Sequence, residues 1–516
     1  MRKKQLFSKK IWLFILIYFI KTAASAQMSL VGQIRTRTEV RDGLGNLAPI
    51  GAKTAAFTSQ RTRLTFGYKW DRVIFTTSVQ DVRVWGQDAS SISNADGSRL
   101  MVHEANAELI LANSVDTTIK FRPIQNLSLK IGRQELVYDD VRLLGNLDWL
   151  QQARRFDAAI FKAQHMGWLL DFGGGFNQNS DGFGVNGTYY TAGNAPTTAL
   201  SNKNVTLAIP AGFIPTAGKN GALVLATPLS TNGQNQQFKS FQMAYLTRKF
   251  KQTKLSALFF KDDFSKYVSD SLGNATQGYV YGRRYNQAGV NSRMTYGLMA
   301  NNQFGNASSF FGKVSTQAWF YAQSGKDRDG LSIKNAYHYG AFATMQKGKW
   351  SFGPGYEVLT GNNGQKVVAG QTSKFDPLYG TPHKHWGYMD YFYVGTGSPA
   401  GGLKDAYLKL KYVNKIFTFT ADGHYFSLAA PTINKLDGAS KLLNSKLGSE
   451  IDLVGQVAMN KFTTLELGYS IMKGSNSLEY VKSNTMDKTK KTGNWAYLML
   501  NIRPDFFYTK PVAIKQ

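Results

Sequence analysis

The sequence predicts an all-β protein, specifically a transmembrane antiparallel β-barrel of about 18 strands. Three observations support this fold class. The chain begins with an export signal, its segments alternate apolar and polar side chains with a period of two, and its connections alternate short turns with long polar segments. After the signal there is no apolar run long enough for a membrane-spanning helix, so the membrane would be crossed by strands.

The first element is the predicted signal peptide, residues 1–26. Basic residues precede the apolar run Ile11 to Ile20, which ends in the small residues Ala24, Ser25 and Ala26. This apolar run is too short to span a bilayer comfortably as a helix. We therefore expect cleavage before Gln27, and a single outer-membrane β-barrel domain over residues 27–516.

Composition restricts the partners and the means of stabilisation. The chain contains no cysteine, which excludes disulfides and a lipoprotein anchor. Its formal net charge is +28, which favours anionic partners. An exported protein rarely meets nucleic acid, and no nucleic-acid recognition motif stands out. Outer-membrane lipid, anionic polysaccharide and small anionic solutes remain as expected partners.

Strand segments follow the signal in order. From Leu30 to Arg41 an apolar face alternates with a face of charged and amide side chains, and Arg61 to Trp70 behaves alike. The same pattern recurs near the C-terminus, at residues 405–412, 450–457 and 465–471. One apolar face and one charged face in every segment indicate a wall between lipid and a polar lumen.

Connections between these segments also alternate. Short turns such as Trp70-Asp71-Arg72 and His165-Met166-Gly167 take turns with long polar segments near residues 180–235, 264–291 and 362–400. Short turns on one side and long loops on the other are typical of outer-membrane barrels, with the turns in the periplasm and the loops outside the cell. A secreted soluble β-protein is the competing interpretation, but it would not tolerate inward faces so rich in charge.

The predicted inward faces of the first three strands are rich in arginine. They carry Arg35, Arg37, Arg41, Arg61, Arg63 and Arg83, opposed only by Glu39 and Asp81. Facing lipid, each arginine would cost about 2–4 kcal/mol near the bilayer midplane. The arginines could line a path for anions, because guanidinium groups bind carboxylates in pairs of hydrogen bonds. They could equally pair with lumen acids and only hold the barrel in shape.

Two strands do not keep a constant alternation phase. Val73 to Val79 share one face at alternate positions, whereas Val82 and Val84 lie on the other, so we expect a β-bulge near Gln80 and Asp81. The strand that reaches Gly132 would point Arg133 and Glu135 toward lipid. Either a bulge at Gly132 or a position at the barrel rim is required.

The segment 132–157 concentrates charges of both signs. Its charged residues are Arg133, Arg142, Arg154 and Arg155 on the basic side, and Glu135, Asp139, Asp140, Asp148 and Asp157 on the acidic side. A segment whose charges nearly balance would bind a polyanion only weakly. A connection folded into the lumen, with its charges mutually paired, explains them better. An ordinary solvated outer loop is the alternative.

A later segment, Phe375 to Tyr393, combines His383 and His385 with many aromatic residues. The two histidines lack a convincing third ligand, so we expect no metal and no cofactor. Tyr379, Trp386 and Tyr388 could stack against sugar rings at the pore mouth. Plain loop packing near the outer interface is the other interpretation.

Several stretches resemble the bacterial alginate-export family of outer-membrane barrels. They are QDVRVWG (80–86), GRQELVYDDVRLLGNLDW (132–149), RRFDA (154–158) and FDPLYGTPHKHWGYMDYFY (375–393). The resemblance in the kinds of residues and their pattern extends over essentially the whole mature chain. It implies an 18-stranded barrel, passive passage of an anionic polysaccharide or related solutes through an arginine-lined pore, and periplasmic components of a secretion system as partners. It does not identify the solute.

Four functions therefore compete. We expect an outer-membrane channel for an alginate-like polysaccharide or related anions, with a general anion-preferring porin as the runner-up. An outer-membrane enzyme would need a nucleophile beside a base. Asp422 and His424 share one inward face, but no serine joins them at a recognisable spacing, so we expect no enzyme. A structural or adhesive surface protein would leave the inward arginines unexplained.

Overall fold

The computed structural model describes most of the chain. It covers residues 27–86, 100–114, 124–177, 196–219, 221, 223–224, 238–285, 288–393, 399–436 and 441–508. The predicted signal peptide lies outside these residues, so that expectation stays a prediction. Among the described residues no helix is both long and apolar enough to cross a membrane.

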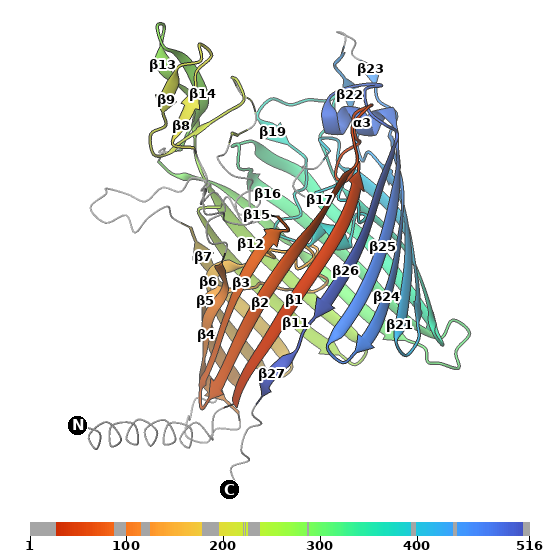
Figure 1. The fold of residues 1–516 in the computed structure, drawn as a ribbon. Helices are drawn as coiled ribbons and strands as arrows, with labels where there is room; N and C mark the ends of the chain where they lie inside the picture. The colour runs from red at the N-terminus through yellow and green to blue at the C-terminus, as the bar shows by residue number, and fades with distance from the viewer. Residues whose placement is uncertain are drawn as a thin grey trace, which may run out of the picture.

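Eighteen antiparallel strands close into a barrel (Figure 1), as the sequence predicted. The wall strands are β1 (Gln27–Asp42), β2 (Ala55–Trp70), β3 (Val73–Val84), β4 (Met101–Asn113), β5 (Asn126–Gln134), β6 (Phe156–His165), β7 (Trp168–Phe176), β11 (Ser240–Phe250), β12 (Thr253–Ser265), β15 (Val290–Phe304), β16 (Lys313–Lys326), β17 (Ser332–Lys347), β18 (Trp350–Leu359), β20 (Leu403–Val413), β21 (Phe417–Ser427), β24 (Lys446–Asn460), β25 (Thr463–Gly474) and β26 (Thr492–Ile502).

The first and last wall strands seal the barrel. β1 pairs with β26 from Ile34–Ile502 to Asp42–Asn494. A short strand, β27 (Asp505–Tyr508), follows β26 and pairs with the beginning of β1. Closure leaves no wall edge unpaired, as a sheet surrounded by lipid requires, because hydrocarbon offers no partner to a free backbone N–H or C=O.

The two ends of the barrel differ. The short turns, the start of β1 and β27 lie at the lower end in Figure 1, and most of the long connections lie at the upper end. Five further short strands, a strand pair and one helix project there: β8 (Thr198–Leu200), β9 (Thr206–Ala208), β10 (Phe213–Pro215), β13 (Val268–Asn274), β14 (Gly278–Arg284), β22 (Ile433–Asn434) with β23 (Lys441–Leu442), and α3 (Asn476–Ser483). In an outer membrane the short-turn end faces the periplasm.

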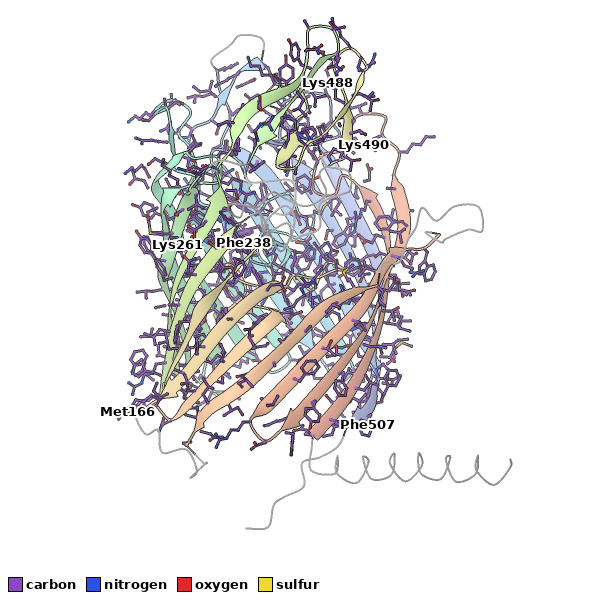
Figure 2. All side chains as sticks on the ribbon, turned by 90° about the vertical axis from the view of Figure 1, so that its left-hand side faces the viewer. Met166, Phe238, Lys261, Lys488, Lys490 and Phe507 are labelled. Carbon is purple, nitrogen blue, oxygen red and sulfur yellow. The ribbon has the colours of Figure 1, made fainter. Side chains whose placement is uncertain are left out.

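The outward face of the wall is apolar and ends in an aromatic girdle. Ile34, Leu298 and Leu467 are among the large apolar side chains exposed on it. At the short-turn end Trp168 packs against Phe250, with ring centroids 6.0 Å apart, and Trp350 packs against Tyr412 at 4.7 Å. Figure 2 shows Met166 and Phe507 at this end, and Lys488 and Lys490 at the loop end. Aromatic residues at strand ends are typical of the membrane interfaces of an outer-membrane barrel.

The hydrophobic core lies inside the barrel, because two connections fold into the lumen. The first inward loop is residues 135–155, between β5 and β6. The second consists of the described residues 360–393 and 399–402, between β18 and β20, and it includes β19 (Gln371–Thr372) and the 3-10 turn η2 (Pro382–Lys384). The two loops join through backbone hydrogen bonds from Tyr379 N–H to Leu143 C=O (2.9 Å) and from Gly145 N–H to Tyr379 C=O (3.1 Å).

The predicted bulge near Gln80 and Asp81 is wrong in its position. β2 and β3 pair without interruption from Ser59–Val84 to Trp70–Val73. The irregularity falls on β4 instead, where the register with β3 skips His103. β3 therefore keeps one phase, and its loop end points Asp81 and Arg83 outward. The apolar face of β3 stops at Val79, because the next residues on that face are Asp81 and Arg83.

Gly132 is not the site of a bulge either. It has a φ of 114°, but β5 pairs with β4 and β6 without a register shift at this residue. Arg133 is the cross-strand partner of Asp157, which faces away from the buried Phe156 and Ala158. The structure therefore places Arg133 at the barrel rim, which was the second of the two predicted explanations.

Candidate functional site

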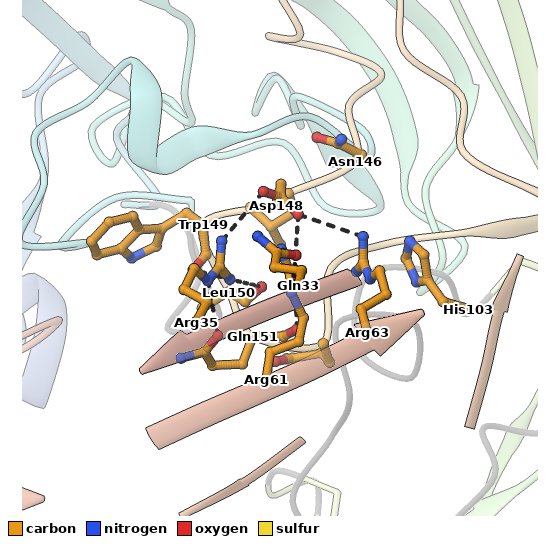
Figure 3. A network of polar contacts seen from close by, with 12 residues as sticks. Gln33, Arg35, Arg61, Arg63, His103, Asn146, Asp148, Trp149, Leu150 and Gln151 are labelled. Carbon is orange, nitrogen blue, oxygen red and sulfur yellow. Dashed lines mark hydrogen bonds and ion pairs between the residues drawn. The ribbon is translucent and has the colours of Figure 1, made fainter. Parts of the chain in front are cut away.

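Three arginines of β1 and β2 converge on one aspartate of the first inward loop (Figure 3). Asp148 lies 2.8 Å from Arg61 Nη1, 3.3 Å from Arg35 Nη1 and 3.9 Å from Arg63 Nη1. The arginines share one face because β1 and β2 pair with Arg35 opposite Arg61 and Gln33 opposite Arg63. Three cations therefore meet one anion at this point of the lumen.

The same arginines also bind the backbone of the first inward loop. Arg35 Nη2 donates to the carbonyls of Trp149 (3.3 Å) and Leu150 (3.2 Å), and Arg37 Nη1 donates to Trp149 C=O (2.8 Å). The Arg37 guanidinium also lies over the Trp149 ring, 4.1 Å from its centroid. We call Arg35, Arg37, Arg61 and Arg63 the basic wall. Its donors satisfy carbonyls that an irregular buried backbone would otherwise leave unpaired.

Burial changes the interpretation of these arginines. Arg35, Arg37 and Arg61 are only 5%, 3% and 1% exposed, because the loop covers them. They fasten the loop to the wall, which is the structural alternative that the sequence left open. Burial alone would raise the pKa of the Asp148 carboxyl, but the charges of Arg61 and Arg35 outweigh it, and the pKa lies below its ordinary value.

Glu39 and Arg41 extend the basic wall toward the loop end. Glu39 is almost fully buried and accepts hydrogen bonds from Arg37 Nε and Arg41 Nε, each 2.9 Å long, and from Trp495 Nε1 (3.0 Å). The Arg41 side chain stays 35% exposed. It is the most accessible of the predicted arginines on β1 and β2.

Arg142 fastens the first inward loop to the opposite wall. It contacts Asp140 of its own loop (2.9 Å) and Glu357 of β18 (2.6 Å). Its guanidinium lies 3.6 Å from the centroid of the Trp319 ring. Asp139 is similarly engaged, because it accepts hydrogen bonds from Tyr245, Lys254 and Ser256.

The remaining charges of the first inward loop stabilise its two ends. Glu135 accepts from Asn146 Nδ2 and lies 2.8 Å from His103 Nε2. Arg154 is fully buried and donates to the carbonyl of Gly380 in the second inward loop (2.6 Å). Burial lowers the pKa of Arg154 to about 10. Arg155 is partly buried beside these contacts.

Two predicted pairs do not face the lumen. Arg83 pairs with Asp81 (2.6 Å), and Arg133 pairs with Asp157 (2.9 Å). Both pairs lie on the outward face at the loop ends of their strands, since Gln80 and Phe156 of the alternate positions are buried inside. The predicted lumen position of these four residues is therefore wrong, because no bulge reverses either strand.

The aromatic segment of the second inward loop lies inside the barrel instead of at its mouth. Tyr379 and Trp386 are fully buried, and the Tyr379 hydroxyl donates to Asp262 (2.7 Å). The prediction that these two rings stack against sugars is wrong for this arrangement, since a solute cannot reach them. Tyr388 is only partly buried and stays a candidate.

The two histidines of that segment have separate partners. His383 stacks on Trp149 with centroids 4.3 Å apart and contacts Asp390 through Nδ1 (2.8 Å). His385 contacts the Asp140 carbonyl through Nε2 (3.1 Å). Burial and the neighbouring Arg142 charge hold the pKa of His385 well below its ordinary value, which keeps it neutral. Both histidines therefore contribute to the packing of the inward loops.

A cavity of about 520 Å³ lies beneath the inward loops, on the side of the short turns. The loops supply Lys384, His385 and Tyr388, and the wall supplies Tyr407, Lys409, Lys411 and Phe342 among others. Amide and hydroxyl side chains such as Asn301, Gln317 and Thr344 also line it. So do Arg142 and the two acids paired with it, Asp140 and Glu357. Sequence reasoning placed Lys409 and Lys411 on an inward face but missed the cavity, since its roof comes from a loop distant in sequence.

The closed barrel, its apolar outward face and its loop-filled lumen define an outer-membrane channel. Residues 27–172 match a family of sequences described as "Alginate export". The predicted resemblance is thus confirmed for this part, which contains the first three motifs, whereas residues 375–393 lie outside the match. No curated protein sequence matches the chain.

Solved structures share the fold at low sequence identity. Acinetobacter baumannii OccAB2 superposes with a TM-score of 0.53 at 11% identity, covering 93% of this chain and 98% of that chain. Acinetobacter baumannii OccAB4 gives 0.52 at 10%, covering 93% and 98%. The outer membrane protein opdK from Pseudomonas aeruginosa gives 0.50 at 11%, covering 93% and 99%. These likenesses concern the fold alone.

Proposed function

We propose that this channel passes anionic solutes, with an acidic polysaccharide or its fragments as the first candidate. The observation that carries the proposal is the cavity on the periplasmic side. Asp422 pairs with Lys409 (2.8 Å) in its lining, whereas Lys384 and Lys411 form no ion pair within the described part of the chain. Two ammonium groups are thus left to meet a solute carboxylate.

The rest of the cavity lining suits a sugar. Phe342, Tyr388 and Tyr407 offer ring faces for stacking, and the amides of Asn301 and Gln317 can exchange hydrogen bonds with hydroxyls. The match of residues 27–172 to an alginate-export family supports the same solute class. In this proposal the basic wall has an indirect role. It fixes the loop that roofs the cavity.

A general anion-preferring porin is the second candidate. The excess of basic residues over the whole chain favours it, since such an excess attracts any small anion. An enzyme has less support, because His424 pairs with Asp405 (2.8 Å) and Asp422 with Lys409, so each side chain is engaged in an ion pair.

Block of single-channel current by oligosaccharides separates the two candidates. Oligouronates added from the periplasmic side should interrupt the current in a saturable way, whereas neutral oligosaccharides of the same length should not. The Lys384→Gln/Lys411→Gln variant should bind oligouronates more weakly while keeping its conductance. Anion preference without any oligouronate block would favour the general porin and contradict a saccharide channel.

A further inference from the structure

Two carboxylates lie side by side on the inward face of β24, which only β25 and β26 separate from β1 in the barrel wall. Glu450 and Asp452 point to the same inward face and are 0% and 1% exposed. As alternate residues of one strand, they project neighbouring carboxyl groups from that face. Two buried anions side by side repel strongly unless a cation lies between or beside them.

The neighbouring charges do not supply that cation. Each is already paired: Asp405 with His424 (2.8 Å), Asp422 with Lys409 (2.8 Å) and Asp390 with His383 (2.8 Å). Glu466, on the next strand, accepts a hydrogen bond from Tyr497 and adds another acid. Within the described residues Glu450 and Asp452 form no ion pair with a basic side chain. We call Glu450 and Asp452 the acidic wall. His424 also acts electrostatically on Asp452, but it is already paired with Asp405.

Unpaired oxygen atoms mark where a cation would sit. Glu450 Oε1 accepts the Met389 N–H (2.7 Å), and Asp452 Oδ2 accepts the Tyr388 N–H (3.3 Å). Glu450 Oε2 and Asp452 Oδ1 are buried and have no hydrogen-bond partner. Ser470, the cross-strand partner of Asp452, is 1% exposed and brings a hydroxyl to the same place. Buried carboxylate oxygens seldom go without a partner.

We propose that Glu450 and Asp452 bind a divalent cation of the calcium class, with the Ser470 hydroxyl as a further ligand. The donors are all oxygen atoms, which hard cations such as Ca²⁺ prefer, and no imidazole or thiol among them would favour zinc or copper. The same carboxylates hold the backbone of residues 388–389. A bound cation would therefore neutralise the acidic wall and pin the second inward loop to it.

A second group in the lumen provides the matched control. His103, Glu104 and Glu135 bring their ligand atoms within 4.8 Å of one another. The two glutamates there already interact electrostatically with Arg63 and Lys130. A cation at this group would compete with those two basic side chains. At the acidic wall the interacting basic group is His424, which Asp405 already holds in an ion pair, so we expect a cation to bind there more strongly.

Terbium luminescence can test the proposal on the folded full-length barrel in detergent. Tb³⁺ substitutes for Ca²⁺ and is sensitised by nearby aromatic rings, here Tyr388 beside the carboxylates. We expect saturable Tb³⁺ emission that Ca²⁺ competes away. The emission should persist in Glu104→Gln/Glu135→Gln and disappear in Glu450→Gln/Asp452→Asn, with each variant's fold verified by its heat-dependent gel mobility.

Two results would overturn the proposal. One is an absence of emission that Ca²⁺ can displace from the wild-type protein, which would mean that a shared proton neutralises the pair. The other is emission retained after both wall carboxylates are replaced, or lost only when Glu104 and Glu135 are replaced. Neither result bears on anion passage, because that proposal rests on the lysines of the periplasmic cavity.

Discussion

Arg61 joins the barrel wall to the loop inside it. Its side chain is 1% exposed and contacts Asp148, the Gln151 carbonyl and Gln33. A charge buried this deeply is tolerated only when its hydrogen bonds are satisfied. Arg83 lies on the next strand but faces outward and pairs with its neighbour Asp81.

The same substitution should therefore loosen the loop at Arg61 and have no effect at Arg83. Arg61→Gln should weaken the attachment of the first inward loop by about 1–3 kcal/mol, because the buried Gln151 carbonyl and the partly exposed Asp148 carboxylate lose a charged donor. Limited proteolysis and open-channel noise should both reveal a looser loop. Arg83→Gln should leave both unchanged. Equal effects of the two substitutions would contradict the assignment of faces.

Residue positions followed from the sequence where a strand keeps one phase. Arg35, Arg37, Arg61 and Arg63 face inward as their alternation predicted. Arg83 was misplaced because a change of face along β3 was interpreted as a bulge. The actual cause is that the apolar stretch ends before the strand does. Period-two patterns cannot distinguish these two cases.

At the scale of elements, the first inward loop has a backbone that needs external support. Asp139, Val141, Leu147 and Ala153 all have positive φ, and for the β-branched Val141, at 66°, this region is costly. The basic wall on one side and the Glu357–Arg142 contact on the other supply that support. The charge pairing that the sequence predicted for this segment thus holds a strained connection in place.

Acid should release this loop, with a direction set by Asp148. Its pKa is lowered in the folded loop, so the ion pairs contribute fully above the ordinary carboxyl pKa of about 3.9. The contribution is lost as the pH falls through the lowered folded value. Channel noise should therefore stay constant from pH 7 to about pH 5 and rise only below about pH 4.

Asp148→Asn offers the check on that assignment. This variant should show the acid behaviour already at pH 7, because its side chain cannot carry the charge. Noise that rises in the wild type between pH 7 and pH 6 would instead identify another titrating group, and the explanation through Asp148 would fail.

The second inward loop shows the limit of prediction from sequence. Residues 362–400 have the polar composition of an outer loop, and the sequence placed them there. In the structure the loop turns inward, because its aromatic side chains pack against rings of distant strands, such as Phe260 near Tyr379 with centroids 5.7 Å apart. Such long-range packing leaves no periodic signal in a single sequence.

For the whole molecule, strand number and barrel closure could be predicted, because period-two alternation and the rhythm of turns and loops run through the entire chain. What fills the lumen could be predicted only in part. Two loops lie against a basic wall on β1 and β2 and an acidic wall on β24. The first loop presents carbonyls to guanidinium groups, and the second presents N–H groups to carboxylates.

A lumen built this way should pass anions over the lysines on its periplasmic side. The reversal potential in a planar bilayer under a salt gradient measures this selectivity. The wild-type channel should prefer anions at low salt, and the preference should shrink at high salt, where the Debye length falls from about 10 Å at 0.1 M to about 3 Å at 1 M. Lys384→Gln/Lys411→Gln should weaken the preference, while Arg83→Gln should keep it. Cation preference in the wild type, or an unchanged potential in the correctly folded double variant, would contradict the account.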